Sequence, residues 1–159
     1  MLDAHFLTHK FERHSHSEFS IGVTHSGVQS FHARGAVHHS RPQNIMVFNP
    51  DVAHDGMAGH ASGFGYQMAY IEPKLIASWC RDYFADRAMR YVRQALMQDV
   101  DCSAQLHRAF IALLQPQESL RAHDLLSQSV LQLLSRHGET GDAQALFHDI
   151  PAWIRTAQD

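Results

Sequence analysis

The hydrophobic pattern of the chain changes at Pro73, and this change constrains the fold more than any other feature of the sequence. Before Pro73, short apolar segments alternate with period two, as strands do, and are separated by glycine, proline and asparagine turns. After Pro73, leucines recur at the three- and four-residue spacing of amphipathic helices. The sequence therefore predicts an α+β fold, in which a barrel or jelly roll of about seven short strands precedes the helices.

The predicted strands lie at residues 19–24, 28–34, 36–40, 45–48 and 66–72, and residues 1–10 are expected to form an arm or an edge strand. Four glycines between residues 56 and 65 indicate a less regular region in that part of the chain. Residues 89–98 fit a strand or a helix equally well, so the pattern leaves that segment open.

Helices are expected in the second half of the chain. The first covers residues 74–84, because proline is tolerated at the first helical position. Two further helices cover residues 103–115 and 119–137, and each opens on a serine that can act as the N-terminal cap. Gly138 is well placed to stop the last one. The short break between these two helices predicts an antiparallel hairpin.

The apolar stripe along this hairpin has two possible uses. It can pack against the barrel as core, or it can face a second subunit in a homodimer. The residues considered for dimerisation are Leu106, Phe110, Leu113, Leu125, Leu126 and Leu133.

The composition indicates one globular domain. Of the 159 residues, 45% are hydrophobic and 18% are charged, so the chain has enough apolar residues for a substantial core. The net charge of -3 argues against a nucleic-acid or membrane-surface binder, since such proteins carry a basic face. The chain has two cysteines, no signal peptide and no apolar run of membrane-spanning length. We therefore expect a cytoplasmic protein without a membrane partner.

The 14 histidines include one set with a meaningful spacing. On a strand, His14, His16 and Glu18 would share one face, because strand side chains alternate with period two. His54, which follows a distant turn, can complete a facial site for a divalent metal such as zinc, nickel or iron, with Glu18 as a fourth ligand. The alternative is that the same residues line a polar pocket without any metal.

Tyr66, Met68 and Tyr70 form an alternating row that can be an aromatic wall of a ligand pocket. The alternative is ordinary packing inside the barrel. The sequence contains no Ser-His-Asp order, no Cys-His nucleophile motif, no phosphate-binding glycine loop and no zinc-finger spacing, so no catalytic residues are predicted.

Three separated blocks of sequence resemble one family. RHSHSEFSIGVTHSGVQSF, RPQNIMVFNPDVAHDG and YQMAYIEP occur in that order, and together they resemble the N-terminal effector-binding domain of AraC-type transcription regulators, a cupin-like domain. The resemblance covers roughly residues 5–137. His14 and His16 match the cupin His-x-His pair and His54 matches its later histidine, whereas Glu18 lies closer to His16 than the usual cupin glutamate does.

The resemblance implies a division of the chain into three parts. Residues 1–72 would form the cupin-like barrel that binds a small effector, and residues 73–138 the helical part through which the domain dimerises. Residues 139–159 resemble the linker and the opening of a DNA-binding domain with two helix-turn-helix motifs, which is absent from this sequence.

Two functions from different classes follow. In the first, the chain is a non-catalytic sensor in which effector binding changes how the missing domain is presented to operator DNA. In the second, it is a small metal-dependent cupin enzyme, such as a dioxygenase or an isomerase, that uses the three histidines and Glu18. A weaker hypothesis is a sensor of pH or of the metal itself. The sequence does not identify the effector, and an amino acid, a sugar or an aromatic acid would all suit the predicted pocket.

Overall fold

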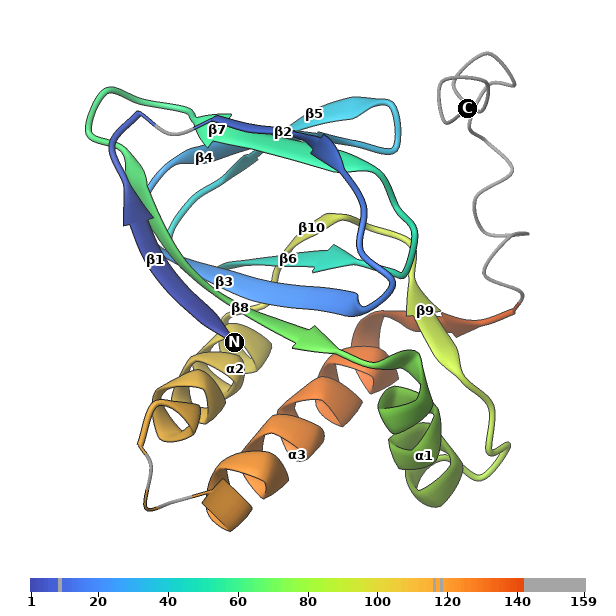
Figure 1. Ribbon diagram of the computed structural model, residues 1–159. Helices are drawn as coiled ribbons and strands as arrows, with labels where there is room; N and C mark the ends of the chain where they lie inside the picture. Colours follow the sequence, from blue (N-terminus) through green and yellow to red (C-terminus); the bar gives the residue numbers. More distant parts are fainter. Residues whose placement is uncertain (9, 116, 118, 142–159) are drawn as a thin grey trace.

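The computed structural model describes residues 1–8, 10–115, 117 and 119–141, and shows two facing β-sheets above a layer of helices (Figure 1). Eight strands precede the first helix, so the predicted order of strands first and helices second is confirmed. These strands are β1 (Leu2–Phe6), β2 (Lys10–His14), β3 (Phe19–Gly27), β4 (Gln29–Ala33), β5 (Ala36–Ser40), β6 (Asn44–Phe48), β7 (His54–Ala58) and β8 (Phe64–Ile71).

The two main sheets are antiparallel and are built from strands that are not consecutive in sequence. One has the order β1-β8-β3-β6-β10 and the other the order β2-β7-β4-β5. The strand β10 (Leu96–Gln98) returns after the first helix to pair with β6, while β9 (Arg90–Val92) pairs with β11 (Gly138–Thr140). The sheets face each other as a jelly-roll barrel, and β1 forms the expected edge strand.

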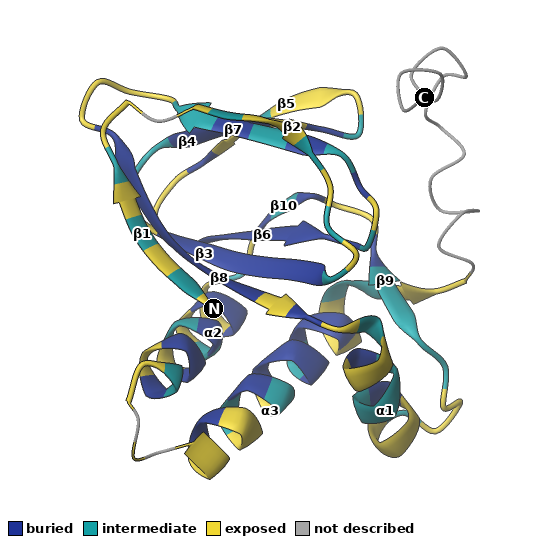
Figure 2. Ribbon diagram, viewed as in Figure 1, coloured by how far each residue is buried: buried dark blue, intermediate teal, exposed yellow. Residues whose placement is uncertain are grey.

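The five-stranded sheet separates two hydrophobic cores, because successive side chains of a strand point to opposite faces. Phe19, Ile21 and Val23 of β3 lie in the core shared with the helices. Phe31 and Met68 belong to the second core, between the two sheets. Figure 2 shows the buried strands β3 and β6 of this sheet between the four-stranded sheet and the helical layer.

The helices are α1 (Pro73–Tyr83), α2 (Val100–Leu113) and α3 (Ser119–His137). Pro73 occupies the start of α1, as predicted. The helix α2 begins earlier than predicted, because Asp99 and not Ser103 is its cap: Asp99 Oδ1 accepts the backbone N–H of Cys102 at 3.0 Å. Asp99 also contacts His137 at the far end of α3, so the two helices form the predicted antiparallel hairpin.

Three further segments differ from the sequence-based expectation. The glycine-containing region after residue 53 begins with a regular strand, β7, and the open segment 89–98 contributes the two short strands β9 and β10. Gly138 ends α3 as predicted but enters β11 directly, without a left-handed backbone conformation. The first two residues of the expected linker, 139 and 140, therefore pair with β9, and residues 142–159 lie outside the described residues.

Most of the residues considered for dimerisation lie inside the single chain. Leu106, Phe110, Leu126 and Leu133 are buried in the core of the single chain, beneath the five-stranded sheet. Leu113 and Leu125 are partly buried and pack against the same core. The stripe is wide because it covers the outer face of the five-stranded sheet. Among the described helices, none is long and apolar enough to cross a membrane.

Candidate functional site

A cavity of about 260 Å³ lies inside the barrel, between the two sheets. Residues from both sheets and from the turn before β3 surround it. They are Leu2, Phe11, His14, His16, Ser20, Gln29, Phe48, His54, Asp55, Tyr66, Met68 and Tyr70. The combination of apolar walls with a few buried polar groups is typical of small-molecule sites.

The alternation of β8 places the predicted aromatic row in this cavity. Tyr66, Met68 and Tyr70 point between the sheets, while Gln67 and Ala69 point toward the helices. Burial raises the pKa of the Tyr70 hydroxyl and that of Tyr66, so both phenols stay protonated at neutral pH.

The three predicted histidines converge at one side of the cavity. His14 ends β2 and pairs with His54, the first residue of β7. The ring centroids of His14 and His16 lie 4.8 Å apart, those of His14 and His54 4.6 Å, and those of His16 and His54 5.5 Å. One nitrogen from each ring lies within 4.8 Å of the other two, which is a spacing that a single divalent ion can bridge.

The prediction that His14, His16 and Glu18 share one face of a strand is wrong. The strand β2 ends at His14, so His16 and Glu18 lie in the following turn and not on one face of a strand. The turn still returns the His16 ring to the cavity, where it packs edge-on against Tyr70 at 4.9 Å. Glu18 accepts a hydrogen bond from Ser17 at 3.0 Å and is not among the residues that line the cavity. The structure therefore does not bring Glu18 together with the three rings.

Backbone carbonyls fix the orientation of two of these rings. His14 Nδ1–H donates to the carbonyl oxygen of Glu12 at 2.6 Å, and His54 Nδ1–H donates to that of Val52 at 2.8 Å. When Nδ1 carries the proton in a neutral imidazole, Nε2 has a free lone pair. The His54 ring is further held by stacking on Phe48, with centroids 3.9 Å apart. Such hydrogen bonds to the second ring nitrogen also orient metal-binding histidines.

Two rings of the cluster, those of His54 and His16, have lowered pKa values. Burial is the main cause that lowers the pKa of His54 to about 4; the nearby His14 and His16 act in the same direction, and the Val52 carbonyl and Asp55 oppose the shift. The pKa of His16 is also lowered, first by burial and then by His14, while Glu18 opposes the shift. Neutral imidazoles are hydrogen-bond acceptors and metal ligands, so both roles are available at neutral pH.

Several cavity residues were missed by the sequence-based prediction. Ser20 lies on the face of β3 opposite to Phe19 and Ile21, so the alternation of that strand could have revealed it. Gln29 of β4 and Phe11 of β2 carried no comparable signal. Which side chains of these two strands point into the cavity depends on how the four-stranded sheet packs over the five-stranded sheet.

A second cluster with metal-binding residue types is a structural contact. Atoms of Asp99, Cys102 and His137 lie within 4.8 Å of one another. The Asp99 carboxylate, however, accepts hydrogen bonds from the Cys102 backbone N–H, from His137 at 2.8 Å and from Arg136 at 3.0 Å. Burial raises the pKa of the Cys102 thiol to about 11, with Asp99 adding to the shift, so the thiol is protonated at neutral pH. The cluster fastens the start of α2 to the end of α3.

A barrel with a partly polar cavity, braced by a helical hairpin, is an arrangement that can bind a small molecule. A family model described as the AraC-like ligand binding domain matches residues 1–135. Because this match covers most of the chain, the protein belongs to the AraC-like ligand-binding domain family. No match is found among curated protein sequences.

Solved structures of AraC-like regulators share the fold. Apo ToxT from Vibrio cholerae is 14% identical with a TM-score of 0.63, and the alignment covers 98% of this chain and 62% of that one. ToxT with a bound unsaturated fatty acid is 10% identical with a TM-score of 0.58, covering 94% and 59%. The AraC-like transcriptional activator CuxR is 10% identical with a TM-score of 0.58, covering 86% and 52%. The chain thus spans between 52% and 62% of the length of these regulators.

Proposed function

We propose that this chain senses a small-molecule effector that binds in the barrel cavity. The observation that carries this proposal is the cavity itself, in which polar side chains from both sheets converge between apolar walls. The proposed contacts are His14, His16, His54, Tyr66, Met68 and Tyr70. Glu18 is left out because it does not line the cavity.

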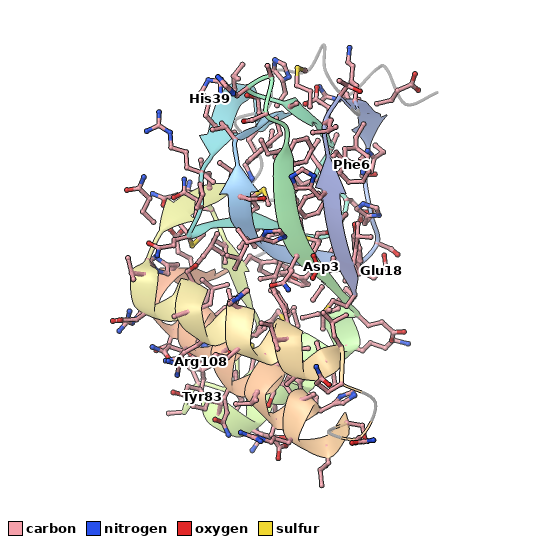
Figure 3. All side chains as sticks on the ribbon, turned by 90° about the vertical axis from the view of Figure 1, so that its left-hand side faces the viewer. Asp3, Phe6, Glu18, His39, Tyr83 and Arg108 are labelled. Atoms are coloured by element: carbon pink, nitrogen blue, oxygen red, sulfur yellow. The ribbon has the colours of Figure 1, made fainter. Side chains whose placement is uncertain are left out.

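Strand β8 offers a route from the cavity to the helical hairpin. Met68 faces the cavity, and its neighbour Gln67 faces the helices. Gln67 Nε2–H donates to Asp3 Oδ2 at 3.0 Å, and Gln67 Oε1 accepts from His107 Nδ1–H of α2 at 2.7 Å. Asp3 is labelled in Figure 3, on β1 just above the helices. A ligand that shifts β8 would therefore also shift β1 and α2.

In a longer AraC-type regulator, the effector would act by binding one conformation more tightly than the other. The favoured conformation would present a C-terminal helix-turn-helix domain to operator DNA, in the cytoplasm. A homodimer is part of this proposal, but its interface would have to use the outward face of the hairpin. Ile111, Leu114 and Leu120 are exposed there, at 45%, 49% and 77%.

A ligand screen on a cavity-filling variant tests the proposal. Amino acids, sugars and aromatic acids are screened for a rise in melting temperature of the wild-type protein. The substitution Met68→Trp fills the cavity, and Val37→Trp adds the same bulk on the exposed outer face of β5 as a matched control. We expect an effector to stabilise the wild type and V37W but not M68W. Equal stabilisation of M68W would place the effector site elsewhere.

A divalent metal is the second candidate ligand of this cavity. The residues fit such an ion, because His14, His16 and His54 converge with two rings already oriented by carbonyls. Zinc, nickel and iron accept imidazole ligands, and a bound ion would supply a Lewis acid for an oxygen-containing effector. Zinc titration followed by calorimetry should show one site in the wild type, none in His54→Ala, and one in His39→Ala, a control on the exposed face of β5.

The enzyme alternative rests on the same three histidines. A metal-dependent dioxygenase or isomerase would need open coordination positions and a substrate beside them. The family match favours the regulator, since the family is defined by ligand binding. Turnover of a small substrate by the iron- or manganese-loaded protein, lost in His54→Ala, would favour the enzyme instead.

A further inference from the structure

We infer that the effector of this cavity is a small, uncharged or cationic molecule whose polar end carries N–H or O–H donors, and that the metal-free cavity rejects carboxylates. The inference deepens the proposed function and rests on it. Three observations carry it: the hydrogen bonds of two imidazole rings, two buried polar atoms without a partner among the described residues, and the charges around the cavity.

The first observation concerns His14 and His54. In both rings Nδ1–H donates a hydrogen bond to a backbone carbonyl oxygen: that of Glu12 for His14, and that of Val52 for His54. In the neutral rings the remaining nitrogen, Nε2, can only accept a hydrogen bond. Nε2 of these two rings is therefore available to accept a hydrogen bond from a donor on the ligand.

The second observation concerns Ser20 and Gln29, which are 1% and 7% exposed and line the cavity from opposite sheets. Ser20 Oγ and Gln29 Oε1 have no hydrogen-bond partner among the described residues. Buried polar atoms are nearly always satisfied, because an unmade hydrogen bond in the interior is costly. The amide oxygen of Gln29 can only accept, so a ligand that satisfies it must bring a donor.

The third observation is the charge of the lining. Among the described residues that surround the cavity, none is a lysine or an arginine. The one carboxylate, Asp55, is engaged by His32, whose backbone N–H and Nδ1 approach its two oxygens at 2.7 Å and 2.9 Å. A ligand carboxylate would lose its hydration without gaining a cationic partner, which disfavours its burial. An ammonium group would instead meet several acceptors.

The size and walls of the cavity limit the rest of the molecule. A volume of about 260 Å³ accommodates one ring with a short substituent. Phe11, Phe48 and Met68 form apolar walls, and Tyr66 adds an aromatic face. An aromatic or alicyclic body with one donor-bearing end therefore fits both the shape and the chemistry.

Three probes that differ only at their polar end test the inference: benzylamine, benzyl alcohol and benzoate. Binding to the wild-type chain is measured by NMR titration with a chelator present. We expect benzylamine to bind at least about tenfold more tightly than benzoate, which is about 1.4 kcal/mol. Benzyl alcohol should fall between the two.

Variants at Gln29 locate the donor-accepting site. Gln29→Leu removes the acceptor at similar volume and should weaken benzylamine about tenfold, whereas Gln29→Glu adds a negative charge and should strengthen it. Ser30→Ala, one residue along the same strand and on its outer face, is the control and should change nothing. The strengthening by Gln29→Glu cannot result from a folding defect.

The outcomes separate this inference from the proposed function. If benzoate binds in the cavity as tightly as benzylamine, the inference about ligand class is overturned while the cavity remains a ligand site. If none of the probes binds, or if Met68→Trp leaves their binding unchanged, both are overturned. A preference for benzylamine that responds to Gln29 but not to Ser30 supports both.

Discussion

The contact between the start of α2 and the end of α3 gives the sharpest stability prediction, and it centres on Asp99. This carboxylate caps α2 through the backbone N–H of Cys102 and also accepts hydrogen bonds from His137 and Arg136. Its side chain is 10% exposed. Replacing Asp99 by alanine should therefore destabilise the domain, and replacing it by asparagine should destabilise it less.

The expected size follows from the individual contacts. Loss of an N-terminal cap costs about 1 kcal/mol, and loss of a hydrogen bond to a buried charged group costs about 2 kcal/mol. The Arg136 contact adds little, because the guanidinium is exposed to solvent. We therefore expect Asp99→Ala to lose about 3 kcal/mol. Asp99→Asn should lose about half of that, since asparagine is as good a cap as aspartate.

The pH dependence gives an independent check. Burial alone would raise the pKa of Asp99, but the Cys102 N–H, His137 and Arg136 outweigh it and hold the pKa well below the usual range. A lowered pKa in the folded state means that the stabilisation is complete above the ordinary aspartate pKa of about 3.9. It disappears as the pH falls toward the folded-state value. The stability gap between the wild type and Asp99→Asn should therefore shrink on acidification.

Urea unfolding followed by circular dichroism, at neutral pH and near pH 3, measures both effects. Asp101→Ala is the matched control, because Asp101 is 74% exposed and makes only a 3.6 Å ion pair with Arg136. Its effect should stay within about 0.5 kcal/mol. Equal losses for Asp99→Ala and Asp101→Ala, or a gap for Asp99→Asn that does not change with pH, would refute this account of the contact.

Three further predictions concern the core. Leu133→Ala should lose about 2–5 kcal/mol without a change of oligomeric state on size-exclusion chromatography, while Leu75→Ala, on an exposed side chain of α1, should lose much less; a change of oligomeric state in Leu133→Ala would support the stripe as a dimer surface. Gly22→Ala should lose about 1–3 kcal/mol in thermal unfolding, since an added Cβ would lie 2.7 Å from a carbonyl oxygen of β8. Cys80 and Cys102 are buried free thiols and should react with a thiol reagent only after denaturant is added; rapid reaction of the native protein would contradict their burial.

The sequence predicted the order of strands and helices because the change of hydrophobic period reflects which faces are buried. It did not predict β7, since a glycine inside a strand usually indicates a loop. In the structure Gly56 lies close to two neighbouring side chains: an added Cβ would lie 3.0 Å from the Gln29 amide and 3.3 Å from the Phe11 ring. This close packing comes from the neighbouring strands and leaves no mark in the local sequence.

The candidate site was predicted only in part, in its residues as in its geometry: Glu18 does not line the cavity, and Ser20 and Gln29 were missed. His14, His16 and His54 converge, but β2 ends at His14, so His16 reaches the cavity from the turn that follows. The start of α2 was missed for a related reason. Asp99 and Ser103 are both good caps, and the choice of Asp99 depends on its contact with His137, a residue far away in the sequence.

One face of the five-stranded sheet lines the barrel cavity, and its other face packs against the helices. On β3 and β8, residues such as Ser20 and Met68 face the barrel cavity, while their neighbours Phe19 and Ala69 pack in the core shared with the helices. Substitutions on the first face can change which molecule is recognised and leave the docking of the helices untouched. Evolution can thus retune the chemical preference of such a domain at alternate positions, and sequences only 10–14% identical to this one retain the same architecture.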